Sequence, residues 1–115
     1  MGIEEDDIDP ARFFDDVEMR IGTITSVEPF PEARKDVYKL RVDFGSEERQ
    51  SAAGLTRYDK EELLGRQVVA VVNLGTVNIA GFESNCLVTG VDAKDGDGVV
   101  FLTPEDDAEN GTRVY

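Results

Sequence analysis

Residues 16–45 read DVEMRIGTITSVEPFPEARKDVYKLRVDFG, two runs of alternating apolar and polar residues separated by a proline-rich segment. Alternation with period two predicts one strand over 17–27 and another over 37–44, joined by a loop over 28–36. Gly22 interrupts the first run and predicts a β-bulge. The second run places Lys39 and Arg41 on the face opposite its apolar residues. The stretch therefore predicts an antiparallel strand pair with one polar face.

The rest of the chain predicts more short strands around a small helix. At the N-terminus, Asp9 is an expected helix cap and Pro10 the first helical residue of a helix that ends near Asp15. Further on, we expect strands over 49–55, 67–74, 84–91 and 98–103, a helix over 58–64, a loop or irregular segment over 75–83, a turn over 95–98, and a turn-rich ending over 104–115 with one more short strand. A helix inserted within about five strands is the pattern of an all-β OB-fold, a five-stranded Greek-key barrel with a short N-terminal helix and a C-terminal extension.

Length and composition indicate one folded domain. We expect residues 1–8 to form an acidic tail and residues 9–115 to form the domain. The sequence contains no run of about 18 apolar residues, so we expect no membrane span. The acidic N-terminus does not resemble a signal peptide. Cys86 is the single cysteine, so no internal disulfide can form, and we expect a small buried side chain in a reducing cytoplasm.

The charge balance indicates adaptation to salt. The chain has 25 acidic and 12 basic residues, a formal net charge of −13, and four lysines against eight arginines. At roughly molar salt the Debye length falls to about 3 Å, so self-repulsion on this scale becomes tolerable. A disordered acidic chain is the alternative, but the apolar patterning is too regular for one.

The acidic residues are unevenly placed. None occurs within 49–58 or 63–82, and residues 30–41 are locally basic. One interpretation is that a ligand lies against these segments, so negative charge has been kept away. The alternative is that 63–82 is a buried strand followed by a loop.

Residues for common catalytic chemistry are absent. The chain has no histidine, which removes the commonest general base and metal ligand, and it has no glycine-rich phosphate loop. The turn at Asp95–Gly98 is not a calcium loop, because Ala93 and Pro104 would occupy the first and last ligand positions. We therefore expect a non-enzymatic protein with no cofactor and no metal.

Three segments, 16–45, 67–74 (QVVAVVNL) and 79–90 (IAGFESNCLVTG), together resemble the tRNA-binding OB-fold domain family found beside some aminoacyl-tRNA synthetases. The resemblance covers about residues 12–113 and is strongest to the CsaA-like branch of export-related chaperones. It implies a homodimer built by the terminal segments, with Phe13 and Phe14 in the interface. It also implies binding either of tRNA or similarly structured RNA, or of unfolded and precursor polypeptides. An assembly module that docks on a synthetase is a third hypothesis.

The basic candidates for the binding face lie on the first two predicted strands and their loop. Arg34 and Lys35 either contact phosphate or are solvated loop bases that neutralise nearby acids. Lys39 and Arg41 stand two residues apart, so they either track a nucleic-acid backbone or form an ordinary exposed strand face.

Polar and apolar candidates come mainly from the later segments. Asn73 ends an apolar strand and either contacts a ligand or forms a turn. Phe82 either stacks on a base, lines a peptide pocket or closes the bottom of the barrel. Ser84 matches a family position on the RNA-facing strand, with polar Asn85 beside it. Phe30 is either an exposed anchor or a side chain that pins its loop.

One departure from the family pattern affects function. CsaA-like chains tend to carry basic residues around the motif at 79–82, whereas here Val77 and Asn78 precede it and Glu83 follows it. The loss of these charges weakens the electrostatic attraction to RNA. Either RNA binding has been lost and the polypeptide role remains, or salt adaptation has removed charges that contribute little at high salt.

Overall fold

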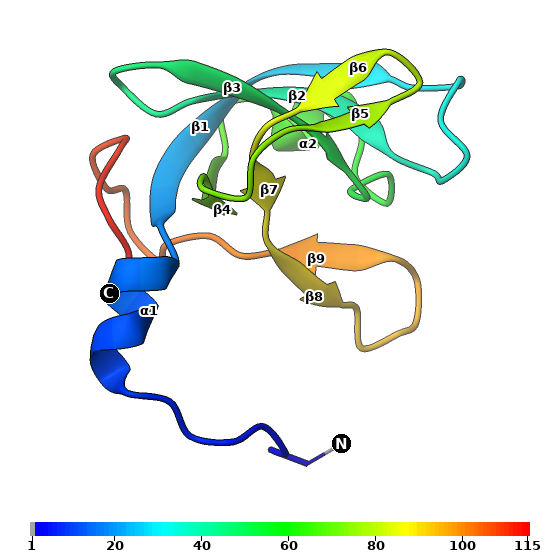
Figure 1. Cartoon of the computed structure of the whole chain (residues 1–115). Coiled ribbons are helices and arrows are strands. Elements are labelled where there is room, and N and C mark those ends of the chain that lie inside the picture. Colours follow the sequence, from blue (N-terminus) through cyan, green and yellow to red (C-terminus); the bar gives the residue numbers. More distant parts are fainter. Residues whose placement is uncertain (1) are drawn as a thin grey trace.

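The computed structural model describes residues 2–115, and Met1 lies outside the described residues. The helices are α1 (Pro10–Asp16) and α2 (Lys60–Leu63). The strands are β1 (Met19–Pro29), β2 (Tyr38–Asp43), β3 (Glu48–Ala53), β4 (Gln67–Val71), β5 (Val77–Ile79), β6 (Phe82–Ser84), β7 (Leu87–Val88), β8 (Gly90–Asp92) and β9 (Val99–Phe101). In Figure 1 the β5–β6 hairpin lies at the top of the barrel beside β2 and β3, whereas α1 and the β8–β9 hairpin lie at the bottom.

The main sheet has the strand order β3-β2-β1-β4-β7, with every pairing antiparallel. It curls until β3 meets the segment before β7, where the Asn85 backbone N–H donates to the Gln50 carbonyl at 2.9 Å. The sheet is thereby a nearly closed barrel, and α2 connects β3 to β4, with Leu63 fully buried in the core. This arrangement confirms the predicted OB-fold.

The core is built from the inward residues of the alternating strands. Its least exposed members include Ile24, Val27, Leu40, Val42 and Val68. Gly22 permits the tight curvature of β1, because a Cβ atom at this position would lie 2.5 Å from Val42 Cγ1 and 2.9 Å from the Phe44 ring. The register shift of β1 lies between Ile24 and Ser26 and not at Gly22, so the predicted bulge position is wrong by a few residues.

Both helices begin at the predicted caps. The Asp9 carboxylate accepts from the Ala11 N–H at 2.9 Å, and Pro10 takes the first helical position. In α2 the Asp59 N–H donates to the Glu62 carboxylate at 2.8 Å, and Gly65 follows the helix with a φ of 82°.

The segment predicted as a loop over 75–83 forms the β5–β6 hairpin instead. Ile79 pairs with Phe82 across a two-residue turn in which Ala80 and Gly81 have φ values of 48° and 86°. Positive φ at both central residues is the geometry of the tight turns that suit twisted hairpins. The pattern was missed because alanine rarely adopts this conformation.

The single strand predicted over 84–91 is divided among β6, β7 and β8. It breaks at Asn85, whose side-chain amide accepts from the Gln50 N–H at 3.0 Å and turns the chain toward β3. The predicted final strand is reduced to a bridge between Arg20 and Arg113, although the Val114 N–H still donates to the Met19 carbonyl at 2.9 Å. Within the described part of the chain, no helix is long and apolar enough to cross a membrane.

Candidate nucleic-acid interface

The outward sides of β1, β2 and β3 form two rows of mostly polar residues. Antiparallel register aligns Ser26 with Arg41 and Gln50, and it aligns Glu28 with Lys39 and then Ala52. A hollow of about 140 Å³ lies over these rows, and we call it the β1–β3 groove; it is lined by Ser26, Glu28, Lys39, Leu40, Arg41, Gln50 and Phe82. The adjoining loops, β1 to β2 and β4 to β7, are those that border the binding face in OB-folds.

Two phenylalanines and a lysine meet at one end of this groove. The rings of Phe30 and Phe82 are 5.5 Å apart at 70°, an edge-to-face contact. Lys39 Nζ lies 5.1 Å from the Phe30 centroid and 5.8 Å from that of Phe82, within the range of cation–π attraction. Phe30 is 6% exposed, in keeping with the loop-pinning alternative. Phe82 is half-buried and lies outside the barrel core, so it does not close the bottom of the barrel.

Ser84 and Asn85 attach the β5–β6 hairpin to β3. Ser84 Oγ accepts from the Ala52 N–H at 3.1 Å, and the Asn85 side chain binds the Gln50 backbone. The Gln50 side-chain amide in turn donates to the Glu83 carbonyl at 2.8 Å. These bonds hold Phe82 over the groove, so Ser84 and Asn85 are placed to position the aromatic side of the site.

Arg34 and Lys35 lie on the loop between β1 and β2 and are exposed. Neither has an ion-pair partner among residues 2–115. The neighbouring acid Asp36 accepts a hydrogen bond from the Thr56 hydroxyl at 2.8 Å. The two cations are therefore free to meet a ligand that extends from the groove toward the loop. Arg41, by comparison, is 3.4 Å from Glu48, and the arginine side chain remains 56% exposed.

Asn73 is not brought to the groove. Its Oδ1 accepts from the Glu18 N–H and its Nδ2 donates to the Asp16 carbonyl, both at 2.9 Å. Glu18 lies just before β1 and is separated from the groove residue Ser26 by about eight residues, or roughly 25 Å of extended chain. Asn73 is therefore far from the groove. Asn73 therefore joins β4 to the end of α1, and Arg113 reinforces this junction through the Phe14 and Val17 carbonyls.

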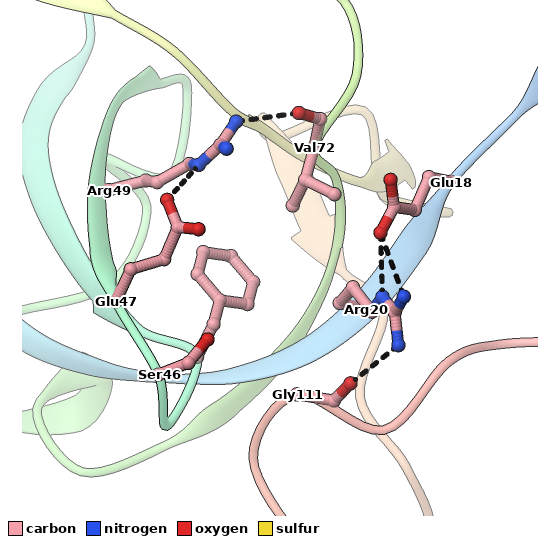
Figure 2. A pocket seen from close by; sticks show the side chains of 8 residues that line it. Glu18, Arg20, Ser46, Glu47, Arg49, Val72 and Gly111 are labelled. Atoms are coloured by element: carbon pink, nitrogen blue, oxygen red, sulfur yellow. Dashed lines mark hydrogen bonds and ion pairs between the residues drawn. The ribbon is translucent and has the colours of Figure 1, made fainter.

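The three arginines in the segments without acidic residues serve the fold. Arg49 pairs with Glu47 at 2.7 Å and donates to the Val72 carbonyl at 2.6 Å (Figure 2). The cavity of about 250 Å³ beside it also contains Arg20, which is held by Glu18 and the Gly111 carbonyl. Because both guanidinium groups already have protein acceptors, this cavity is a poor anion site. Arg57 binds the Asp97 carbonyl, and Arg66 lies 5.0 Å from the Phe101 ring centroid.

Ser26, Glu28 and Gln50 also line the groove, although their positions in the sequence did not predict it. Glu28 was assigned to the proline-rich loop, but β1 extends to Pro29. The alternation of the strand could have identified Ser26 and Glu28 as outward-facing residues, because they flank the inward-facing Val27.

Cys86 is buried at 6% exposure, as predicted for a small core side chain. Burial raises the pKa of its thiol from 9.0 to about 11, and the nearby Arg49 charge opposes part of that change. The thiol is protonated at neutral pH, which makes it a poor nucleophile.

The curled sheet and the groove between its two bordering loops define a small β-barrel domain of the OB-fold class. A family model described as "Putative tRNA binding domain" matches residues 19–113, and the chain belongs to this family.

Solved structures and curated sequences agree with this assignment. The CsaA chaperone protein from Picrophilus torridus is 36% identical with a TM-score of 0.85, and the alignment covers 94% of this chain and all of that one. Chaperone CsaA from Bacillus anthracis is 40% identical with a TM-score of 0.82, covering 95% and 100%. A methionine–tRNA ligase of Methanococcoides burtonii is 41% identical over 89% of this chain, which spans 15% of that enzyme's length.

Proposed function

We propose that this domain binds tRNA or similarly structured RNA in the β1–β3 groove and on the adjoining loop, without catalysing a reaction. The observation that carries this proposal is the gathering of Lys39, Arg41 and Phe82 on one OB-fold face beside the free cations Arg34 and Lys35. Membership of the tRNA-binding domain family supports it.

The groove offers two kinds of attraction to RNA. The four cations of residues 34–41 can neutralise phosphates, a contribution that salt weakens. Phe82 can stack on an unpaired base, which contributes about 1–3 kcal/mol and depends less on salt. At molar salt the stacking contribution dominates, which suits a chain that has no basic residues around 79–82.

Binding of unfolded or precursor polypeptides is the second candidate function. The Phe30–Phe82 pair and the carboxylate of Glu28 could accept an apolar peptide segment that also carries positive charge, and two of the similar structures are CsaA chaperones. A third candidate, docking on a synthetase, follows from the likeness to part of a methionine–tRNA ligase.

A titration of bulk tRNA across KCl concentration tests the RNA proposal. Each phosphate that a cation neutralises adds about 0.9 to the slope with which log Kobs falls against log[salt]. With four available cations, this slope should be no steeper than about 3.6. Weak binding should persist near 2 M KCl because stacking is less sensitive to screening. Absence of association at every salt concentration, together with protection of an unfolded client from aggregation, would favour the chaperone function.

We further propose that the chain forms a homodimer through the outer face of β1, β4 and β7. The register aligns Met19 with Val71 and Leu87, and Ile21 with Val69. Ile21 and Val71 lie outside the core cluster but are only 6% and 9% exposed, whereas Leu87 is 49% exposed. None of these five side chains carries charge, so this face allows a second copy of a chain with net charge −13 to approach.

The helix before this face supports the same proposal. No residue of α1 is buried, and Phe14 is 44% exposed next to Phe13, with ring centroids 5.4 Å apart. The helix is held by polar bonds from Asn73 and Arg113 and not by apolar burial. Its apolar residues gain a packing partner if the terminal segments meet those of a second copy.

Adaptation to salt is expected to be visible in stability. Only five of the 25 acidic residues have an arginine partner within 4.0 Å among residues 2–115, so most of the carboxylates repel one another without compensation. Raising KCl from 0.1 M to 2 M should increase the unfolding free energy by about 2 kcal/mol, or Tm by roughly 8 °C, as the Debye length falls.

Thermal unfolding followed by circular dichroism measures this increase. Near pH 4.2, the sequence isoelectric point, the repulsion is small and the salt effect should largely disappear. An unchanged or lower Tm in 2 M KCl at pH 7 would show that the acidic surface is not a salt adaptation.

A further inference from the structure

A carboxylate lies within a groove that otherwise presents cations. Glu28 stands directly opposite Lys39 across the β1–β2 pair, yet the Lys39 ammonium lies over the rings of Phe30 and Phe82. Among residues 2–115, Glu28 has neither an ion-pair partner nor a side-chain hydrogen bond. It is exposed and lines the groove together with Arg41.

This carboxylate is unfavourable for a groove that only follows a phosphate backbone, because like charges repel. An ionised carboxylate has only acceptors and can receive two parallel N–H donors. The ligand that suits Glu28 therefore presents adjacent N–H groups beside an acceptor for Lys39 or Arg41.

Guanine is the base with that pattern on its Watson–Crick edge. Its N1–H and N2–H groups are neighbouring donors, and O6 is an acceptor beside them. Adenine and cytosine place a ring-nitrogen acceptor where the carboxylate would need a donor, and uracil offers a single N–H between two acceptors. Unpaired bases in RNA expose this edge and stack on aromatic side chains.

We infer that the β1–β3 groove selects an unpaired guanine, an inference that rests on the RNA-binding function proposed above. Phe82 stacks on the base, Glu28 accepts from its N1–H and N2–H groups, and Arg41 or Lys39 donates to O6. The hollow of about 140 Å³ suits a single base and not an RNA double helix. The bases on either side continue toward Arg34 and Lys35.

The test uses nine-nucleotide single-stranded RNAs, uridine throughout except for a central guanine, adenine or inosine, with binding followed by fluorescence anisotropy. The wild-type chain should bind the guanine RNA about tenfold more tightly than the adenine RNA, the low end of the 1–3 kcal/mol for a bidentate base contact. Inosine lacks the N2 amino group and should fall between them.

Glu28→Gln removes one of the two acceptors and places an N–H against a guanine donor. The guanine-to-adenine preference should fall below about twofold, while affinity for the adenine RNA is kept or raised. Glu32→Gln is the matched control, because it removes the same charge from the exposed neighbouring loop and should retain the preference. Circular dichroism and Tm establish that both variants are folded.

The outcomes separate the two levels of the proposal. If neither tRNA nor any of the short RNAs binds, the RNA-binding function itself is wrong. If RNA binds with equal affinity for guanine and adenine, or if Glu28→Gln keeps the preference, the guanine inference is overturned and RNA binding stands. Equal gains in affinity for all RNAs in both variants would show that Glu28 acts only through its charge.

Discussion

The double substitution Arg34→Glu and Lys35→Glu is expected to weaken tRNA association about a hundredfold or more in 0.1 M KCl. Both side chains are exposed, without an ion-pair partner among residues 2–115, on the loop that borders the groove. A hydrogen bond to a charged group contributes about 1.5–3 kcal/mol, so the loss of two phosphate contacts corresponds to at least two powers of ten in Kd. Fluorescence anisotropy with labelled tRNA measures the change.

A matched variant separates local contacts from overall charge. Lys60→Glu with Lys94→Glu changes the net charge by the same amount at exposed positions on α2 and in the β8–β9 turn. It should lower affinity by much less than the loop variant. Equal losses in the two variants would mean that long-range repulsion, and not this loop, controls binding. Client protection should survive in both variants if peptide binding depends on the apolar part of the groove.

The strands that form the barrel were predictable because they obey a local rule. On β2, Leu40 and Val42 are fully buried while Lys39 and Arg41 face outward, as alternation requires. The β5–β6 hairpin was not predictable in this way, because its turn depends on a positive φ at Ala80, which alanine adopts only when its surroundings hold it. Here the Asn78 side chain accepts from the Gly81 N–H at 3.0 Å across the turn, and bonds between β3 and Ser84 and Asn85 hold the other end of the hairpin.

Local sequence patterns likewise predicted only some of the residues that line the groove. Lys39 and Arg41 were predicted as neighbours from their spacing, and β2 places both in the groove. The contact of Phe82 with Phe30 joins residues more than fifty positions apart and depends on how the hairpin folds back over the sheet. Asn73 was grouped with them by resemblance, whereas its amide is occupied by the end of α1.

In the first half of the segment without acidic residues at 63–82, the structure favours the alternative of a buried strand over that of a ligand-facing surface. Its first half is α2's last residue and β4, which is buried on one side and apolar on the other. Its basic residue Arg66 packs on Phe101 and not in the groove. Negative charge is therefore absent from β4 because one face lies in the core and the outer face carries Val69 and Val71 beside the neutral Gln67.

Leu87→Glu is expected to convert the proposed homodimer to a monomer, raising its dissociation constant at least about a hundredfold. In a two-fold symmetric interface the same patch meets itself, so one substitution introduces two carboxylates. Removing each from water costs several kcal/mol in an apolar interface that offers no cation. Val88, the neighbouring residue, is in the core, whereas Leu87 is 49% exposed, so the folded monomer should tolerate the change.

Sedimentation equilibrium over a range of concentrations, in 0.1 M and 2 M KCl, measures the dissociation constant. Screening at 2 M KCl reduces repulsion between the two carboxylates but not the cost of removing them from water, so dimerisation should stay impaired at high salt. Val77→Glu is the control, since Val77 is 59% exposed and lies on the β5–β6 hairpin, outside the face of β1, β4 and β7, so its substitution should leave the dimer intact. If Leu87→Glu remains a dimer while Val77→Glu dissociates, the two copies meet through the hairpin and the groove, and RNA binding and self-association would then compete for one surface.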